Sequence, residues 1–323
     1  MQVQLRVRRT DPETKASRWQ DYTTELPSYG TVLDGLLQVR EEQDGTLAMR
    51  CSCRSAICGS CTMRINDHAR LACITKVADL APDGAPIKVE PAGNQPVIKD
   101  LVVDLEPFFR KVRQVQPFLQ PEGPAPEREY IVDHDAMVHL NPVMACIMCG
   151  ACVSDCTALE VDSAFIGPAA LAKAYRFVAD PRDGRKLTRL EMLTQPTGVW
   201  DCTHCFECVQ QCPKGVAPMD RIMALREAAL EEGVWHGGGA RHSDEFARSV
   251  GRSGRLDEFR LMPISTGIFN VPGQLQLIPG AIRLVMRGKL PNPIHRSIPG
   301  VEGVRRLFQA RKNGKKEGSK VTP

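Results

Sequence analysis

The sequence lacks any run of about 20 apolar residues, the length needed to cross a bilayer, and residues 1–8 lack the apolar core of a signal peptide. We therefore expect a protein of the reducing cytoplasm. It also lacks a G-x-G-x-x-G flavin fingerprint and any evident acid–base or nucleophile constellation. These absences predict a chain that carries out no bond chemistry itself.

Aromatic residues are scarce at 5%, whereas 42% hydrophobic and 25% charged residues are ordinary for a globular protein. A length of 323 residues leaves room for two small domains and an extension. The net charge of +4 is unevenly distributed, because eleven Lys and Arg but only two Glu lie between Arg283 and Lys320. This basic tail lacks the aromatic or motif context of nucleic-acid binding, so we expect no nucleic-acid partner.

Cysteine is abundant, with 13 residues. In a reducing compartment, cysteines at regular spacings are better interpreted as metal ligands than as disulfides. Cys53-x4-Cys58-x2-Cys61, followed by Cys73, has the plant-type ferredoxin spacing for a [2Fe–2S] cluster. Gly59 and the neighbouring serines suit a tight loop whose N–H groups point at the sulfurs. The surplus Cys51 is predicted to be a spectator.

Two further runs have the form C-x2-C-x2-C-x3-C, which bacterial-type ferredoxins use to bind iron–sulfur clusters. In such runs the fourth cysteine ligates the neighbouring cluster, so we predict a crossed pairing. One [4Fe–4S] cluster would take Cys146, Cys149, Cys152 and Cys212, and the other site would take Cys156, Cys202, Cys205 and Cys208. Two zinc sites are the alternative, but zinc typically uses separated pairs of cysteines.

Periodicity predicts a hairpin from strands near residues 3–7 and 19–26, then a helix over 31–43. A second amphipathic pattern predicts a helix over residues 101–112. Four prolines within residues 116–126 indicate a linker. A further helix is expected to begin at Pro168 and to end at Asp180-Pro181.

After residue 233 the periodicity of apolar residues gives weaker indications of structure. The glycines at 237–239 indicate a flexible break, and Ser243 could cap a short helix. Prolines at 263, 272, 279, 291, 293 and 299 argue against long helices. His236 and His242 lack spaced partners for a metal site.

The fold class is therefore predicted as α+β. An N-terminal β-grasp, plant-type ferredoxin-like domain precedes an all-α bacterial-type ferredoxin-like domain and a mostly irregular C-terminal extension. The predicted boundaries are 1–105 for the [2Fe–2S] domain, 106–126 for a connecting helix and linker, 127–235 for the two-cluster domain, and 236–323 for the basic extension.

The cysteine spacings, VIKDLVVD at 97–104, FIGPAALAKAYRFVADPRD at 165–183 and CPKGVAP at 212–218 resemble the iron–sulfur subunit of succinate dehydrogenase and fumarate reductase, respiratory complex II. The resemblance implies a non-catalytic electron-transfer subunit on the cytoplasmic face of the cell membrane. A flavoprotein subunit carrying FAD would oxidise succinate to fumarate, and electrons would pass through the three clusters to a quinone at a membrane subunit. The fumarate reductase direction, a subunit of another flavin dehydrogenase and a stand-alone carrier remain alternatives.

The third cluster departs from the family pattern. Typical members hold a [3Fe–4S] cluster with the cysteines that match Cys156, Cys202 and Cys208, and have a non-ligating residue where this chain has Cys205. We therefore expect a second [4Fe–4S] cluster, with a spectator Cys205 and [3Fe–4S] as the alternative. This resembles an unconventional branch that works with heterodisulfide-reductase-like cysteine-rich subunits in place of heme-bearing anchors.

Two residues near this cluster also differ from the family. The family usually has a proline where this chain has Thr157 and a histidine where it has Thr203. His204 follows one step later, either as a proton relay or as an exposed or capping side chain. In the tail, residues 275–290 mix large apolar side chains with Arg283, Arg287 and Lys289. We hypothesise that this segment lies against a membrane face or a membrane subunit, the alternative being a solvated basic tail.

Overall fold

The computed structural model describes residues 1–235, 237–292 and 296–318, so His236 lies outside the described residues. The chain forms two compact units, Met1–Glu232 and Gly233–Pro323. The predicted subdivision of the first unit at residues 105 and 126 stays a prediction.

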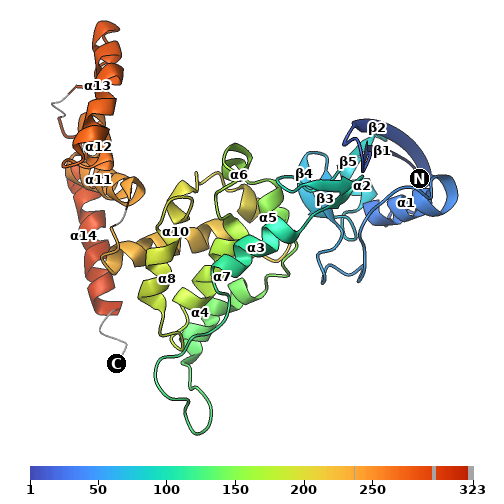
Figure 1. Cartoon of the computed structure of the whole chain (residues 1–323), viewed down its shortest axis with the longest axis horizontal. Coiled ribbons are helices and arrows are strands. Elements are labelled where there is room, and N and C mark those ends of the chain that lie inside the picture. Colours follow the sequence, from blue (N-terminus) through green and yellow to red (C-terminus); the bar gives the residue numbers. More distant parts are fainter. Residues whose placement is uncertain (236, 293–295, 319–323) are drawn as a thin grey trace. The chain divides into compact units, whose positions relative to one another are not determined.

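The first unit begins with a five-stranded sheet of order β2-β1-β5-β3-β4 (Figure 1). Its strands are β1 (Gln2–Thr10), β2 (Ser17–Glu25), β3 (Thr62–Ile65), β4 (His68–Leu71) and β5 (Ile87–Glu90). β1 and β2 form the predicted antiparallel hairpin, and β1 pairs in parallel with β5. Alternate β1 side chains are buried, as the period of a strand requires.

Helix α1 (Val32–Gln38) follows the hairpin and continues as a π-helical turn, η1 (Val39–Gln43), where the sequence predicts a helix. It begins at a capping box, in which Thr31 and Asp34 satisfy each other's backbone N–H groups. Its apolar face buries Val32, Leu33 and Leu36 in the core shared with the sheet. The short helix α2 (Val77–Leu80) lies between β4 and β5.

The helix predicted from residue 101 begins only at Glu106, so that prediction is wrong at its start. The backbone instead forms β6 (Val97–Lys99) and β7 (Val102–Val103), followed by α3 (Glu106–Gln114). Asp100 turns the chain between the two strands with φ of 48°. Its buried carboxylate accepts hydrogen bonds from Arg9 Nε (3.0 Å) and from the backbone N–H groups of Thr10 and Ala48. These long-range contacts override the local periodicity.

The remainder of the first unit is helical, as predicted. Its elements are α4 (His134–Met144), α5 (Ala151–Ser154), α6 (Thr157–Val161), α7 (Pro168–Val178), α8 (Lys186–Leu193), η2 (Val199–Asp201), α9 (Glu207–Gln210) and α10 (Pro218–Glu231). α7 packs against α10 and α3, and its start at Pro168 confirms the prediction.

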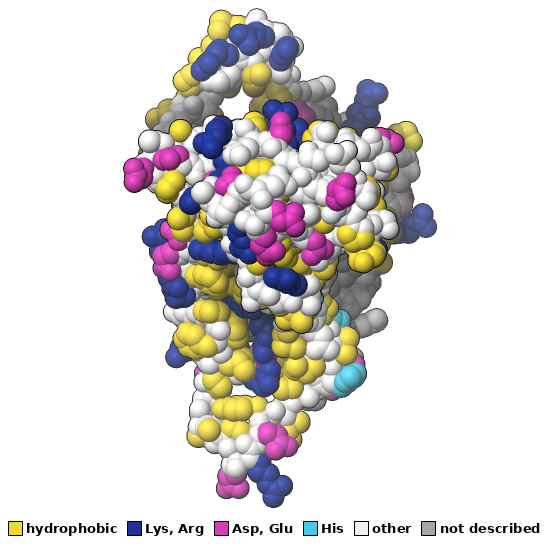
Figure 2. Space-filling model, turned by 90° about the vertical axis from the view of Figure 1, so that its right-hand side faces the viewer, with side chains coloured by type: hydrophobic (Ala, Val, Ile, Leu, Met, Phe, Trp, Pro, Cys, Tyr) yellow, Lys and Arg dark blue, Asp and Glu magenta, His cyan; other side chains and the backbone are white. Residues whose placement is uncertain are grey.

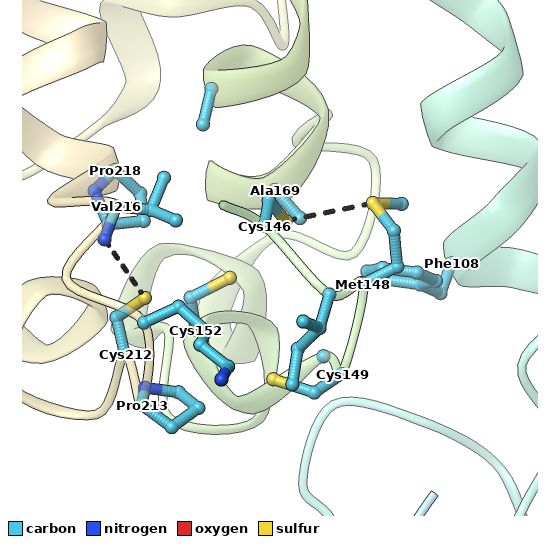
Figure 3. Close-up of a pocket in the computed structure, with 14 residues that line it drawn as sticks. Phe108, Cys146, Met148, Cys149, Cys152, Ala169, Cys212, Pro213, Val216 and Pro218 are labelled. Carbon is cyan, nitrogen blue, oxygen red and sulfur yellow. Dashed lines mark hydrogen bonds between the residues drawn. The ribbon is translucent and has the colours of Figure 1, made fainter. Parts of the chain in front are cut away.

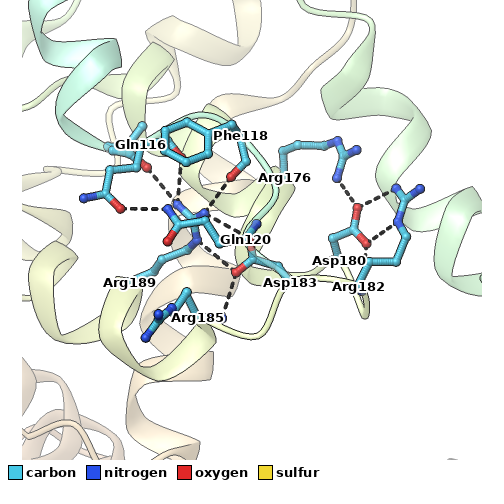
Figure 4. A network of polar contacts seen from close by, with 10 residues as sticks. Gln116, Phe118, Gln120, Arg176, Asp180, Arg182, Asp183, Arg185 and Arg189 are labelled. Carbon is cyan, nitrogen blue, oxygen red and sulfur yellow. Dashed lines mark hydrogen bonds and ion pairs between the residues drawn. The ribbon is translucent and has the colours of Figure 1, made fainter. Parts of the chain in front are cut away.

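The proline-rich linker is held onto the helical region by Arg189 of α8 (Figure 4). The guanidinium, 3% exposed, donates to the carbonyl oxygens of Val115, Gln116 and Phe118 at 2.8–2.9 Å. It also pairs with the buried carboxylate of Asp183 at 2.9 Å. A segment without regular hydrogen bonding is thereby fixed through its carbonyl groups.

The second unit is helical, so the prediction of a mostly irregular extension is wrong. It contains α11 (Gly238–Ser253), α12 (Glu258–Thr266), α13 (Val271–Met286) and α14 (Val301–Gly318). Pro272 sits in the first turn of α13, where its missing N–H costs nothing. Pro263 and Pro279 lie inside helices among good helix formers such as Leu, Met and Ala.

The glycine-rich break and the helix start predicted at Ser243 are also wrong, because α11 begins at Gly238. Its first-turn glycines occupy positions whose N–H groups have no intrahelical partner in any helix. Among the described residues, no helix has the length and apolar character that a bilayer crossing requires.

Candidate cluster-binding sites

The first group of cysteines surrounds the loop before β3. Cys53 Sγ accepts hydrogen bonds from the backbone N–H groups of Ser55 (3.4 Å), Ile57 (3.3 Å) and Cys58 (3.3 Å). Positive φ angles at Arg54, Ala56 and Gly59 curl the loop so that these amides converge. The loop therefore has the donor arrangement that its small residues predicted.

The other three cysteines of this group act on one another electrostatically. Burial and the nearby thiols of Cys73 and Cys58 together raise the pKa of Cys61 to about 12, although a backbone hydrogen bond from Cys73 lowers it in part. A hydrogen bond from the Ser60 hydroxyl, supported by the backbone N–H of Cys53, lowers the pKa of Cys58 to about 6. Cys51 is partly buried against the hydrophobic core of the sheet domain.

The second group lines one pocket (Figure 3), formed by Cys146, Cys149, Cys152 and Cys212. Cys146 and Cys149 lie in the turn that leads into α5, Cys152 lies in α5 itself, and Cys212 follows α9. Burial raises the pKa of Cys149 and, far more, that of Cys152, which the charges of the neighbouring thiols raise as well. The backbone N–H of Val216 donates to Cys212 Sγ at 3.3 Å. The structure thus brings together the four thiols of the predicted crossed pairing.

The third group comprises Cys156, Cys202, Cys205 and Cys208. Burial, together with the charges of Cys202, Cys156 and Cys205, raises the pKa of Cys208 to about 12. Burial also raises the pKa of Cys156, which accepts hydrogen bonds from the backbone N–H groups of Leu159 and Ala158 at the start of α6. The second crossed set is therefore also close together.

Cys205 is the exposed member of the third group. Burial alone would raise its pKa, but hydrogen bonds from Thr157, from the Glu207 N–H and from the Thr203 hydroxyl bring the pKa below its ordinary value. The two threonine hydroxyl oxygens lie 3.4 Å apart. Thr157 and Thr203 thus both contact Cys205.

Sequence reasoning missed Arg226 of α10. Its guanidinium is 7% exposed, donates to the carbonyl oxygens of Val199 (2.9 Å) and Trp200 (3.0 Å), and stacks over the Trp200 ring. It also donates to His204 Nε2 at 2.5 Å. His204 is thus a partner of Arg226, and burial together with that charge lowers its pKa. No local pattern in the sequence signals this contact.

The first and second groups touch directly. Gly59, between Cys58 and Cys61, has φ of +72°, and a Cβ added there would lie 2.5 Å from Cys149 Cβ. Only glycine combines this backbone conformation with such close approach. The tight loop around the first group therefore lies against a cysteine of the second.

Loop 93–94 of the sheet domain is hydrogen-bonded to the segment that leads to the third group. Asn94 Nδ2 donates to the carbonyl oxygens of Val153 (2.9 Å), Ser154 (3.2 Å) and Cys156 (3.0 Å), and Gly93 N–H donates to Ser154 Oγ. Asp155 accepts from the Ala69 N–H at 2.7 Å. Sequence reasoning also missed these contacts, which connect the sheet to the segment that ends at Cys156.

Buried thiols with convergent amide donors fit anionic iron–sulfur clusters, whose iron offsets the cost of burying thiolates. Within residues 1–235, 237–292 and 296–318, no three His, Cys, Asp or Glu side chains converge as a single metal ion would require. A cluster makes no such demand, since its thiolates bind iron atoms at different corners. The fold and the sites define an iron–sulfur electron-transfer protein.

Comparison with known proteins supports this class. Residues 4–110 match the family described as a 2Fe-2S iron-sulfur cluster binding domain, and residues 142–216 match the 4Fe-4S dicluster domain. The chain is 38% identical to a fumarate reductase iron-sulfur subunit of Mycobacterium tuberculosis, over 73% of this chain and 98% of that protein.

Two further relatives extend the comparison. An 8-methylmenaquinol:fumarate reductase iron-sulfur subunit of Wolinella succinogenes is 33% identical over 89% of this chain and 91% of its own length. A succinate dehydrogenase iron-sulfur subunit of Coxiella burnetii is 34% identical over 70% of this chain and 96% of its own length. The chain belongs to the family of iron–sulfur subunits of succinate dehydrogenase and fumarate reductase, the electron-transfer subunits of complex II.

A solved structure agrees with this assignment. A chain of the Mycobacterium smegmatis Sdh1 complex in the apo form matches with a TM-score of 0.67 and 27% identity, covering 72% of this chain and 96% of that one. The chain thus carries [2Fe–2S] and [4Fe–4S] cluster-binding domains within a subunit of an oxidoreductase complex.

Proposed function

We propose that the chain is the non-catalytic electron-transfer subunit of a succinate dehydrogenase that passes electrons from a flavoprotein subunit towards a quinone. The observation that carries this proposal is the grouping of twelve cysteines into three sets within one continuous unit. When bound, the clusters supply one-electron redox chemistry. The protein's own part is to bind them, exclude water and fix their order.

We assign the ligands according to this grouping. The [2Fe–2S] cluster takes Cys53, Cys58, Cys61 and Cys73 of a β-grasp domain. One [4Fe–4S] cluster takes Cys146, Cys149, Cys152 and Cys212 of a bacterial-type ferredoxin-like domain. The contact of Gly59 with Cys149 supports the first two sites as neighbours in the electron path.

The third site is proposed to hold a second [4Fe–4S] cluster through Cys156, Cys202, Cys205 and Cys208. Hydrogen bonds from Thr157 and Thr203 lower the pKa of Cys205 against the effect of burial, which favours the thiolate that iron binds. The fourth iron, which the usual three-cysteine site lacks, would thus have a ligand.

The proposed partners are a flavoprotein subunit and either a membrane anchor or a heterodisulfide-reductase-like cysteine-rich subunit. The protein would lie peripherally on the cytoplasmic face of the membrane, close to the quinone. The name of the Wolinella succinogenes relative, which matches across most of this chain, includes 8-methylmenaquinol, a lipid-soluble quinol.

Fumarate reduction is a second candidate, because two relatives at 38% and 33% identity are named fumarate reductase subunits. The ligands do not distinguish the two directions, but the cluster potentials do. Clusters poised mostly above the fumarate/succinate couple favour succinate oxidation, and clusters poised mostly below it favour reduction.

The test is an EPR-monitored redox titration of the purified complex, with iron analysis. We expect about ten irons per chain, from one two-iron and two four-iron clusters, and no three-iron signal after oxidation. Zinc in place of iron would overturn the proposal. A three-iron signal in freshly oxidised complex would overturn only the assignment of Cys205.

A further inference from the structure

Helix α13 carries an uninterrupted apolar stripe. At 3.6 residues per turn, the stripe positions recur every three or four residues along one face. All five side chains of the stripe are exposed, with exposed fractions of 63% for Val271, 59% for Leu275, 47% for Ile278, 52% for Ile282 and 57% for Val285. Gln276 lies on the opposite face, Arg283 lies in the last turn to one side of the stripe, and Arg287 directly follows the last helical residue, Met286.

Helix α13 has no buried apolar face of the kind that normally stabilises a helix in a protein. None of its residues is buried, although its sequence is apolar on average. Most helices in proteins are stabilised by packing of their apolar face, so an uncovered face of this kind indicates a surface that binds something else. Phe269, just before the helix, is 96% exposed and extends the apolar surface.

The charge around the stripe indicates what covers it. Residues 259–301 contain no Asp or Glu but five cations, which are Arg260, Arg283, Arg287, Lys289 and Arg296. At the top of Figure 2, the α13 region shows hydrophobic side chains beside Lys and Arg and no acidic side chain. An apolar face flanked only by cations complements a surface with an apolar interior and an anionic rim.

We propose that α13 binds directly to the surface of a bilayer that contains anionic phospholipids, with its axis in the plane of the interface. The stripe enters the boundary of the acyl region, and the long side chains of Arg283 and Arg287 reach back to the headgroups. A helix of 16 residues that carries arginine lies on a bilayer rather than crossing it.

This inference rests on the proposed peripheral location and adds the element and the ligand that secure it. A lipid surface is favoured over a protein partner because the cations surround the stripe without any acidic residue that would specify one partner geometry. Each basic residue near an anionic membrane strengthens binding, and salt weakens this contribution.

The test is vesicle flotation of the intact complex, purified with its clusters. The probes are phosphatidylcholine vesicles with and without phosphatidylglycerol, at low and high salt. Ile282→Glu and Ile278→Glu place a charge on the stripe, whereas Gln276→Glu places the same charge on the opposite face as a matched control. Arg283→Gln with Arg287→Gln tests the cations.

We expect the unmodified complex to float with anionic vesicles and much less with neutral ones. Each stripe variant should lower the partition coefficient at least about tenfold, since charge replaces apolar burial, while Gln276→Glu should stay within about twofold. The double arginine variant should lose the preference for phosphatidylglycerol. Cluster absorbance and succinate-dependent reduction of a soluble dye report that each variant is folded. If the proposed function is wrong, dye reduction fails in the unmodified complex as well, and flotation is still measured independently.

Three outcomes would overturn the inference: no flotation of the unmodified complex, unchanged flotation of both stripe variants, or equal losses in the stripe variants and Gln276→Glu. Loss of another subunit from the purified stripe variants, with vesicle binding retained, would identify the stripe as a protein interface instead.

Discussion

The guanidinium of Arg226 donates to the carbonyl oxygen of Cys202 at 2.8 Å, and its charge counteracts the rise that burial causes in the pKa of that thiol. A buried cation thus lies at the third cysteine group, fixed by several carbonyl groups of the same loop. Charge near a cluster is one determinant of its potential. This arginine therefore links helix α10 to the redox properties of the third site.

Arg226→Gln is expected to lower the midpoint potential of the third cluster, because a positive charge that stabilises the reduced form is removed. The effect should be on the order of 1 kcal/mol, or tens of millivolts. Arg226→Lys keeps the charge but not the planar fork, so the potential should change less while cluster occupancy falls. EPR redox titration and iron analysis measure the two effects.

Lys186→Gln is the control, since it removes a positive charge from an exposed side chain of α8. Its potentials should match those of the unmodified protein. If Arg226→Gln retained full occupancy and an unchanged third potential, Arg226 would be only a structural side chain.

Gly59→Ala is expected to impair both the first and the second clusters. The added Cβ would be 2.5 Å from Cys149 Cβ, closer than real Cβ atoms approach, so one of the two loops must move. Positive φ adds about 1 kcal/mol of strain. Visible absorbance and iron content per chain should both fall.

Gly84→Ala separates the two causes, because Gly84 has nearly the same φ, +73°, with nothing within 4 Å of the added Cβ. This variant should carry the backbone strain yet keep its iron. Equal iron losses in both variants would contradict a specific role for the Gly59–Cys149 contact.

The grouping of cysteines could be proposed from the sequence because ligand spacing is local, and the four thiols proposed for the second site do line one pocket. The assignment of ligands to clusters stays a prediction. The hairpin and the helix from Pro168 followed from periodicity. The contacts of Asn94 and Arg226 escaped prediction because they join segments about 60 and 24 residues apart through backbone carbonyls. Backbone carbonyls leave no trace in residue identity.

The errors have a related cause. Residues 101–105 continue the apolar spacing of the helix that follows them, but the preceding turn at Asp100 is fixed by Arg9, which lies 91 residues away. In the C-terminal unit, the expectation of no long helices rested on the number of prolines and not on their positions within a helix. Pro272 starts a helix, and Pro279 is tolerated inside one whose neighbours strongly favour helix.

Cys205→Ala is expected to convert the third cluster to a three-iron centre, because the remaining three cysteines still bind the other irons. An EPR signal typical of an oxidised three-iron cluster should appear, and the midpoint potential should rise. Cys51→Ala is the matched control, since Cys51 packs against the sheet domain core and belongs to no predicted ligand set. Identical spectra for Cys205→Ala and the unmodified protein would make Cys205 a spectator.

Arg189→Met is expected to destabilise the first unit strongly while leaving the cluster potentials unchanged. The substitution keeps the apolar volume but leaves the Asp183 carboxylate, whose side chain is fully buried, without its cation. It also removes the donors that satisfy three linker carbonyls. Breaking a buried pair by deleting one partner costs about 3–5 kcal/mol. The thermal midpoint should therefore fall by several degrees, and proteases should cut within residues 116–126.

Arg185→Met provides the comparison, because this neighbouring arginine is exposed and contacts Asp183 only through its backbone N–H (3.0 Å), which the substitution retains. Its effect should stay within about 0.5 kcal/mol. Equal thermal midpoints for the two variants would mean that the linker is held by something other than Arg189. A loss confined to Arg189→Met, with unchanged potentials, would separate the stability of the linker from the tuning of the clusters.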